Sequence, residues 1–329
     1  MAYAPAGNTT QTGSLTHLAT VYYDRRALTS LRTKFMFWKG CDERTLALKN
    51  GKTIQMYRYS QLGANTTPAT EGDVGSSVTL TSTTVSATVS QYADFISLSD
   101  LLVDTAIDGD IVGVAADQLG YRAGLSVNRI IRAEVDSAAA SINVPLLGTY
   151  MSTADVANIR ARFAGADIPP FGDGYYRCLM HPYVVYDFVN DPQVGGYIDV
   201  VKQHPDMPGN ERLWTYEASG FIGRWQGFNI WEATDLTVVP GSPNQYRTYF
   251  FASEGLGAID LAGRGPTRTE DQNKQRFRVN VVRNLPVSVA NPTGTIRALA
   301  SYNFVFVAKI LDTNPYRIRK IDAPTSLGL

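Results

Sequence analysis

Cysteine and histidine are scarce in this chain of 329 residues. Its two cysteines, Cys41 and Cys178, lie far apart, which excludes a disulfide framework and predicts reduced thiols in a cytosolic product. Its three histidines are His17, His181 and His204. None of them has a histidine, cysteine or carboxylate neighbour at the spacing of metal ligands. We therefore expect all three histidines to be structural rather than catalytic.

Net charge is also absent, because 30 lysine and arginine residues balance 30 aspartate and glutamate residues. This balance gives no support for a protein that binds nucleic acids or membranes through its overall charge. The distribution is slightly uneven, since residues 1–50 carry a basic surplus of four and residues 309–329 a surplus of two. We read this as a weak sign that both termini share one basic face.

Long apolar runs are missing as well. The longest, such as residues 304–308, are far too short for a membrane-spanning helix. No charged leader followed by an apolar run opens the sequence, so we expect no signal peptide. With 44% hydrophobic and 18% charged residues, the composition is that of an ordinary folded protein, and its length allows two or three substructures.

Motifs for catalysis or cofactor binding are absent too. The sequence has no nucleophile elbow, Walker loop or dinucleotide fingerprint. Residues 220–227 are glycine-rich, but they include the bulky Trp225 and no helix follows to hold a phosphate, so we read a turn. Asp108 and Asp110 read as a helix break rather than a calcium site, and residues 71–73 as a solvated turn. We therefore predict no catalytic, metal-binding or cofactor-binding residue, no cofactor and no enzymatic activity.

What the sequence does contain is one long helical stretch, residues 97–141. Ser97 and Asp100 form a start that resembles a capping box. The triplet at residues 108–110 is expected to interrupt the helix, because glycine and aspartate are unfavourable inside one. The part after the break predicts a rod of roughly 45 Å at ~1.5 Å per residue. Apolar side chains recur there at helical spacing: Val112, Ala115, Leu119, Ala123, Val127, Ile130, Ile131 and Ala138.

Residues 46–92 read as a long hairpin that is too poor in large apolar residues to build its own core. An Asn-Gly pair at residues 50–51 signals a tight turn, and residues 53–59 alternate apolar with polar side chains. Residues 60–77 have no period, and residues 78–92 return as a second strand. A lone hairpin is marginally stable, so we expect this one to reach over a neighbouring subunit. An edge hairpin on its own domain is the alternative.

The N-terminal region has no clear period. Residues 1–14 are small and polar, and we expect an end that orders only against a partner. Residues 15–45 read as an arm that packs on something else, with a first core helix around residues 20–34 as the alternative. The aromatic residues that favour an arm are Tyr22, Tyr23, Phe35, Phe37 and Trp38.

The second half of the chain reads as an α+β unit followed by two strands. Helices are expected over residues 153–163 and 182–189, and strands over residues 175–180, 227–233 and 246–252. Two further strands, at residues 276–283 and 300–311, are expected to complete a sheet against the long helix, together with the base of the hairpin. One domain would then be built from two distant parts of the chain, with residues 145–270 inserted between them.

This order of elements resembles the tailed-bacteriophage major capsid proteins with the HK-ninety-seven-like fold. The short motifs resemble most the N-four-type coat protein family, over roughly residues 45–311. The matching motifs are Thr70-Glu71-Gly72, Gln91-Tyr92, Ser99-Asp100, the tyrosine-bearing strand at residues 175–180 with His181-Pro182, and the stretch from Glu217 to Ile230. The chain departs from the family's pattern at Ala93, where many relatives have glycine, and at residues 312–329, which match nothing in it.

The resemblance implies an α+β capsid fold in four parts. Residues 1–45 would form an N-terminal arm, and residues 46–95 an extended hairpin loop lying on a neighbour. Residues 96–144 and 271–329 would form a peripheral domain containing a spine helix. Residues 145–270 would form the axial domain, which lines the centre of each ring of subunits.

The resemblance also implies a function and partners. The chain would be a major capsid protein that self-assembles into hexamers and pentamers, forming the icosahedral shell around a phage genome without enzymatic turnover. It would contact copies of itself, portal and scaffold or decoration proteins, and packaged DNA without sequence preference, but no membrane. It would be located in the virion capsid, after assembly in the host cytoplasm. The alternatives are another self-assembling surface or structural protein, or an enzyme with a site made of carboxylates alone.

The lysine distribution predicts a shell without covalent cross-links. The namesake of the fold joins a lysine of its extended loop to an asparagine of a neighbour, but here Lys49 and Lys52 lie at the base of the hairpin, and residues 63–91 contain no lysine. A lysine beside a tight turn is solvated and protonated, and therefore a poor nucleophile. Denaturing electrophoresis of boiled particles should show a single band near 36.0 kDa. A ladder of multimers would contradict this expectation.

Overall fold

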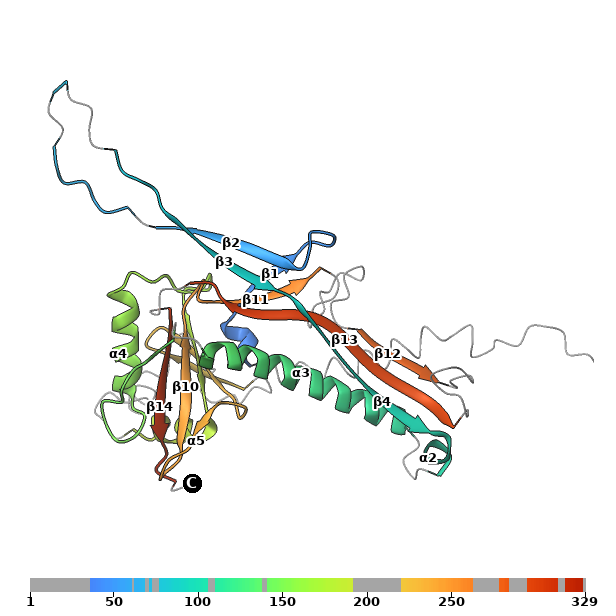
Figure 1. Ribbon diagram of the computed structural model, residues 1–329. Coiled ribbons are helices and arrows are strands. Elements are labelled where there is room, and N and C mark those ends of the chain that lie inside the picture. Colours follow the sequence, from blue (N-terminus) through green and yellow to red (C-terminus); the bar gives the residue numbers. More distant parts are fainter. Residues whose placement is uncertain are drawn as a thin grey trace, which may run out of the picture.

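The described part of the chain forms two sheets, a long helix and a projecting hairpin (Figure 1). The computed structural model describes residues 36–60, 62–68, 71–72, 77–105, 110–137, 141–191, 220–262, 278–283, 295–312 and 317–327. Helices and strands are mixed along these residues, so the α+β class expected from the sequence is confirmed.

Strand β13 (Ile296–Ile310) is the centre of a five-stranded sheet. β4 (Ser90–Ser99) pairs with one edge of it, while β12 (Arg278–Arg283) and β11 (Leu256–Leu261) pair with the other edge. β1 (Asp42–Leu46) then pairs with β11 in parallel. β13 therefore joins strands from the beginning of the chain to strands from its second half.

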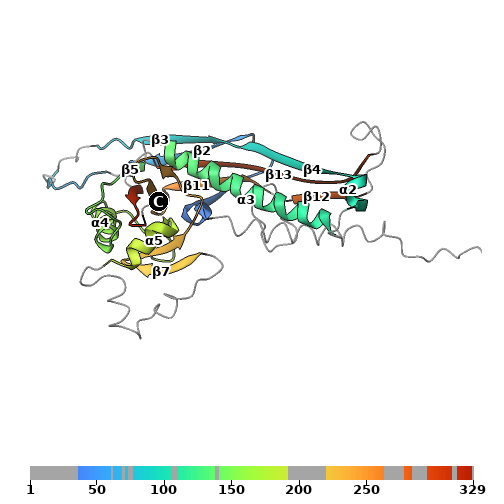
Figure 2. The ribbon, with the colours of Figure 1, turned by 90° about the horizontal axis from the view of Figure 1, so that it is seen from below.

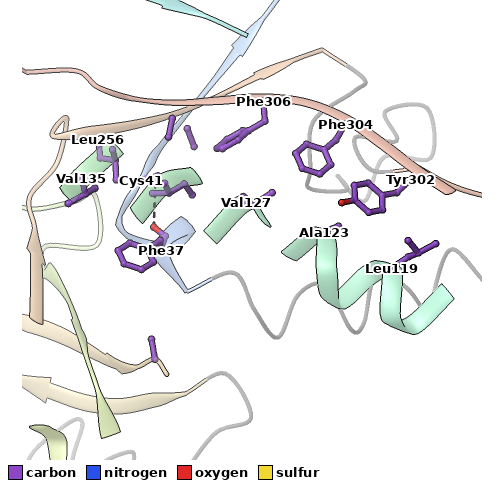
Figure 3. Packing of buried hydrophobic residues seen from close by; sticks show 14 of the residues in the cluster. Phe37, Cys41, Leu119, Ala123, Val127, Val135, Leu256, Tyr302, Phe304 and Phe306 are labelled. Carbon is purple, nitrogen blue, oxygen red and sulfur yellow. Dashed lines mark hydrogen bonds between the residues drawn. The ribbon is translucent and has the colours of Figure 1, made fainter. Parts of the chain in front are cut away.

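Helix α3 (Ile111–Ser137) packs along one face of this sheet (Figures 1 and 2). Three aromatic side chains of β13 lie against it, namely Tyr302, Phe304 and Phe306 (Figure 3). The helix meets them mainly with small and medium-sized residues, which allows close packing. Most of the predicted apolar stripe is confirmed as buried: Val112, Ala115, Leu119, Ala123, Val127 and Ile131. Ile130 is only partly buried, and Ala138 lies outside the described residues.

The structure describes two helices on either side of the predicted break, whose residues 106–109 lie outside the described ones, and the first helix begins later than the sequence predicts. Ser99 precedes helix α2 (Asp100–Thr105) and caps it, because its Oγ accepts a hydrogen bond of 3.3 Å from the backbone N–H of Leu102. The prediction of a start at Ser97 was wrong, because β4 continues through Leu98, which is buried opposite Ala298. After the break, Asp110 Oδ1 accepts a bond of 3.1 Å from Gly113 N–H and caps α3.

The second sheet has seven strands and lies beside the C-terminal end of α3 (Figure 1). Helices α4 (Thr153–Ala164) and α5 (Pro182–Val189) share one apolar core with it, and both confirm sequence predictions. His181 N-caps α5, and Pro182 occupies its first turn. The strand order is β5 (Ser141–Asn143), β14 (Ile318–Pro324), β10 (Gln245–Phe251), β6 (Tyr176–Met180), β8 (Phe228–Glu232) and β7 (Phe221–Trp225), with β9 (Val238–Val239) paired to β10.

Four strands lie outside the unit in which the sequence places them. β1 falls in the predicted arm, yet it belongs to the five-stranded sheet, and so does β11 from the predicted inserted unit. β14 and β5 fall in the ranges expected for the peripheral domain, yet they pair with each other in the seven-stranded sheet. These strands pair across the expected boundaries, because the edge that a short strand joins depends on non-local hydrogen bonds, which local periodicity does not encode.

The end of the predicted arm is part of the core rather than a free segment. Phe37, in the short helix η2 (Phe37–Gly40), is fully buried between Tyr249 and Phe251, with ring centroids 5.0 and 6.4 Å away. Trp38 packs against Phe306 at 5.6 Å. The expectation that these two aromatics need an outside partner was therefore wrong. Tyr22, Tyr23 and Phe35 lie outside the described residues.

The hairpin consists of β2 (Thr53–Tyr59) and β3 (Ser82–Thr88), paired antiparallel. Its base packs on the face of the five-stranded sheet opposite α3, where Ala87 and Val89 are buried against Ile259 and Val305. The paired part of the hairpin, residues 53–59 and 82–88, is called the stem. The stem thus lies on its own chain, as in the alternative interpretation. The segment beyond it projects past both sheets (Figure 1). The predicted strand at residues 78–92 is divided between β3 and β4, because the chain passes from the hairpin into the sheet near Val89.

A charge placed in the helix–sheet contact should destabilise the fold. Leu119 is 1% exposed, so Leu119→Asp would bury an unpaired carboxylate and lower the free energy of unfolding by about 3 kcal/mol or more. The neighbouring Gln118→Asp, at an exposed position of the same helix, is the control and should change little. Urea or thermal unfolding measures both variants. Equal stability of the two would show that the stripe does not form the core.

Candidate assembly surfaces

The histidine and the two cysteines that the structure describes, His181, Cys41 and Cys178, are buried. Among the described residues, no group of three or more histidine, cysteine or acidic side chains could hold a metal ion. His181 stacks on Tyr246 with ring centroids 4.4 Å apart, and burial lowers its pKa. Cys41 and Cys178 are unpaired and buried, and burial raises the pKa of both thiols. No helix within the described ranges is long and apolar enough to cross a membrane.

The remaining candidates are turns and caps. Glu71 lies on an exposed turn in the distal part of the hairpin. The predicted turn at residues 220–227 is mostly strand: Gln226 and Gly227, both with positive φ, join β7 to β8. Asp110 caps α3. His17, His204, Asp73 and Asp108 lie outside the described residues.

Exposed apolar side chains instead gather at three separate places, and such surfaces commonly mark sites of association. The first is the hairpin, the second the α2 end of the five-stranded sheet, and the third the side of the seven-stranded unit around α5. The exposed residues are Tyr57, Tyr59, Leu62, Val78 and Leu80 on the hairpin, Phe95, Leu101 and Leu102 at the α2 end, and Leu147, Tyr150, Tyr186 and Leu327 near α5.

The hairpin surface follows from strand alternation. Along β2, Ile54 and Met56 face the chain's own sheet, whereas Tyr57 and Tyr59 face away and are 64% and 63% exposed. Opposite the two tyrosines, β3 presents only short hydroxyl side chains, Thr84 and Ser82. The outward face is therefore aromatic and uncharged. Its large exposed rings are suited to contact with another protein surface.

The α5 surface surrounds a hollow. Leu147, Tyr150 and Tyr186 line it together with the carboxylate of Asp187. Asp187 is engaged within the chain, because one of its oxygens accepts a hydrogen bond of 3.0 Å from the backbone N–H of Ser326. This contact holds the segment that follows β14 against α5. The hollow thus offers an apolar rim over a carboxylate that is already bonded.

A partly buried polar junction joins α3 to the seven-stranded sheet and fixes these surfaces relative to one another. Arg247 on β10 forms ion pairs of 3.0 Å with Asp136 and 2.6 Å with Asp322, and its hydrogen bonds with these carboxylates raise its pKa. Asp136 also accepts a hydrogen bond of 2.8 Å from the hydroxyl of Tyr249, whose pKa is raised by burial. One guanidinium therefore links a helix and two strands.

A second junction lies one turn earlier on the helix. Arg132 donates to Asp235 at 3.0 Å, and Asn128 donates to the same carboxylate at 3.3 Å. The side-chain oxygen of Asn128 in turn accepts a bond of 2.9 Å from the backbone N–H of Phe37. The C-terminal half of α3 is thus held both to the loop after β8 and to the N-terminal segment.

Sequence reasoning missed both junctions. One signal was present: Asp136 lies in the last turn of α3, where a negative charge opposes the helix dipole unless a cation compensates it. That position indicated a basic partner. It could not identify Arg247, which lies 111 residues further along the chain.

Comparison with known proteins gives structural matches only. No family model and no curated protein sequence matches the chain. The capsid of Ralstonia phage GP4 matches with a TM-score of 0.62 at 12% identity, over 87% of either chain. The cyanophage Pam1 capsid matches at 0.60 with 14% identity, over 89% of this chain and 93% of that one. The chain has the HK-ninety-seven-like capsid fold. The SrpI encapsulin from Synechococcus elongatus shares it too, at 0.54 and 9% identity over 90% of both chains.

The Arg247 junction should contribute strongly to the stability of this capsid fold. Arg247→Gln would leave two largely buried carboxylates, Asp136 and Asp322, without their cation, lowering the free energy of unfolding by about 2–4 kcal/mol. Arg162→Gln removes an exposed arginine and serves as the control. Urea unfolding of both variants measures the difference. A loss no larger than that of the control would show that the junction is not needed for stability.

Proposed function

We propose that the chain is the major capsid protein of a tailed bacteriophage, a non-enzymatic subunit that assembles with copies of itself into a closed shell around the genome. The observation that carries the proposal is the hairpin, which projects from a capsid fold and exposes aromatic side chains on β2 and aliphatic side chains on its distal part, all left exposed by the described part of the chain. Such a surface has no role in binding or converting a small molecule. A shell subunit needs it, because its neighbours supply the missing partner.

The parts of the chain take the following roles in this proposal. α3 and the five-stranded sheet form the peripheral domain, and the seven-stranded sheet with α4 and α5 forms the axial domain around the centre of a ring. The hairpin is the extended loop. Compared with the boundaries expected from the sequence, β1 and β11 move to the peripheral domain, and β14 and β5 to the axial domain, because of their strand pairing.

The finer details rest on the resemblance in sequence. By that resemblance, the rings of subunits would be hexamers and pentamers, the chain would be a coat protein of the N-four type, and the shell would assemble in the host cytoplasm. Portal and scaffold or decoration proteins would be further partners. Contact with packaged DNA would be weak and independent of sequence, as suits a chain with no net charge whose termini are slightly basic.

Electron microscopy of the purified full-length protein tests the proposal. Closed shells or rings of subunits are expected. Sheets or fibres would instead indicate a surface-layer protein, and a small compact oligomer would favour the enzyme alternative. Shells purified from infected cells should contain phage DNA, whereas shells filled with a protein cargo would point to an encapsulin-like compartment.

Shortening the hairpin should separate assembly from folding. Ser60 and Thr81 form the last described backbone rung, with Ser60 N–H donating to Thr81 at 2.9 Å. Replacing residues 61–80 with Asn-Gly would close the strands with a tight turn and remove exposed Leu62, Val78 and Leu80. We expect an unchanged melting temperature but at least a tenfold loss of particles in sedimentation. Particles of normal yield and size would show that the distal hairpin is not an assembly element.

A further inference from the structure

The contact between the hairpin and its own chain ends at one residue. Along β2, the half-buried side chains on the inner face are Ile54, Met56 and Arg58. The first two join the apolar cluster on the five-stranded sheet. Tyr59 and the cross-strand partner of Arg58, Thr83, are both exposed. Arg58 is therefore the last inward-facing residue of the stem, and it lies where the projecting part begins.

Arg58 binds a carboxylate at the end of β13. Its guanidinium forms an ion pair with Asp312, whose side chain is 3% exposed, while that of Arg58 is 38% exposed. The other oxygen of Asp312 accepts a hydrogen bond of 2.5 Å from Arg317 Nε. Arg317 also donates to the backbone carbonyl of Ser253 at 2.7 Å. The carboxylate that receives Arg58 is thus fixed in place by the body of the protein.

We propose that Arg58 is the positioning residue of the hairpin, and that its ion pair with Asp312 sets the direction in which the distal hairpin leaves the body. The apolar contacts of the stem hold its base, but apolar contacts are non-directional. The Arg58–Asp312 ion pair is different, because Arg317 holds the Asp312 carboxylate in place from its other side. The ion pair therefore acts at a single point, the end of the stem. The importance of this direction for assembly rests on the proposed capsid function.

The geometry allows an experiment to distinguish a positioning role of Arg58 from a role in the overall stability of the fold. Without Arg58, Asp312 keeps Arg317 as its partner, so no buried carboxylate is left unpaired. Removing Asp312 instead would affect two arginines at once, and Asp312→Asn is therefore not a suitable test. Since Arg58 is partly exposed, salt should weaken its ion pair, whereas it does not weaken the apolar contacts of the stem.

Hydrogen exchange of the unassembled full-length chain tests the proposal. In the Arg58→Gln variant, the backbone amides of residues 57–59 in β2 and of their partners, residues 82–84 in β3, should exchange about threefold to tenfold faster than in the parent chain. The exchange rates of the α3 and β13 amides should stay unchanged. Lys52→Gln removes one exposed positive charge from the same hairpin and should behave like the parent. In the parent, raising the salt concentration from about 0.05 to 1 M should accelerate the same amides, and Arg58→Gln should not respond.

Two results would overturn the proposal. The first is equal exchange of the hairpin amides in Arg58→Gln and the parent, with no salt response in the parent. The second is faster exchange throughout β13 and α3 in Arg58→Gln, which would make Arg58 a general stability residue. Neither result depends on shell formation. If the exchange pattern is as expected but micrographs show no shells, the positioning role stands and the proposed function fails.

Discussion

The packing of α3 against β13 is the contact on which the rest of the structure depends. β13 is paired along both edges, so its backbone hydrogen bonds are largely satisfied within the sheet. Its aromatic side chains then need an apolar cover on one face, and the small residues of α3 let a helix lie close enough to supply it. Two distant parts of the chain are thereby joined in one core, which carries both the hairpin and the seven-stranded unit.

The two faces of β13 contact different parts of the molecule, the core around α3 on one side and the hairpin on the other. Because side chains alternate along a strand, Phe304 and Phe306 face α3, whereas Val305 faces the opposite side and supports the base of the hairpin. The stem therefore rests on this sheet, while the distal part of the hairpin has no apolar support from the residues that the structure describes. At the other end of α3, Arg247 couples the helix to the second sheet. The exposed apolar surfaces thus lie on elements that are fixed to a common frame.

The sequence predicted the features that depend on local patterns. Most of the apolar stripe of α3, the alternation in residues 53–59 and the His-Pro start of α5 follow from side-chain periodicity and capping chemistry, and these are confirmed. Non-local pairing could not be predicted in this way. The places of β1 and β14 depend on which sheet edge is free, and the burial of Phe37 depends on Tyr249, more than two hundred residues away. Only Asp136, at the unfavourable end of its helix, signalled a distant partner.

The central claim is that the outward face of the hairpin obtains its apolar partner from another copy of the chain. A cryo-electron microscopy reconstruction of the assembled particle tests this most directly, because it shows what covers Tyr57 and Tyr59. The account predicts a closed shell in which the hairpin of each subunit lies on a neighbouring subunit, with both tyrosine rings excluded from solvent. A shell in which the hairpins stand free in solvent, or fold back onto their own chain, would contradict it.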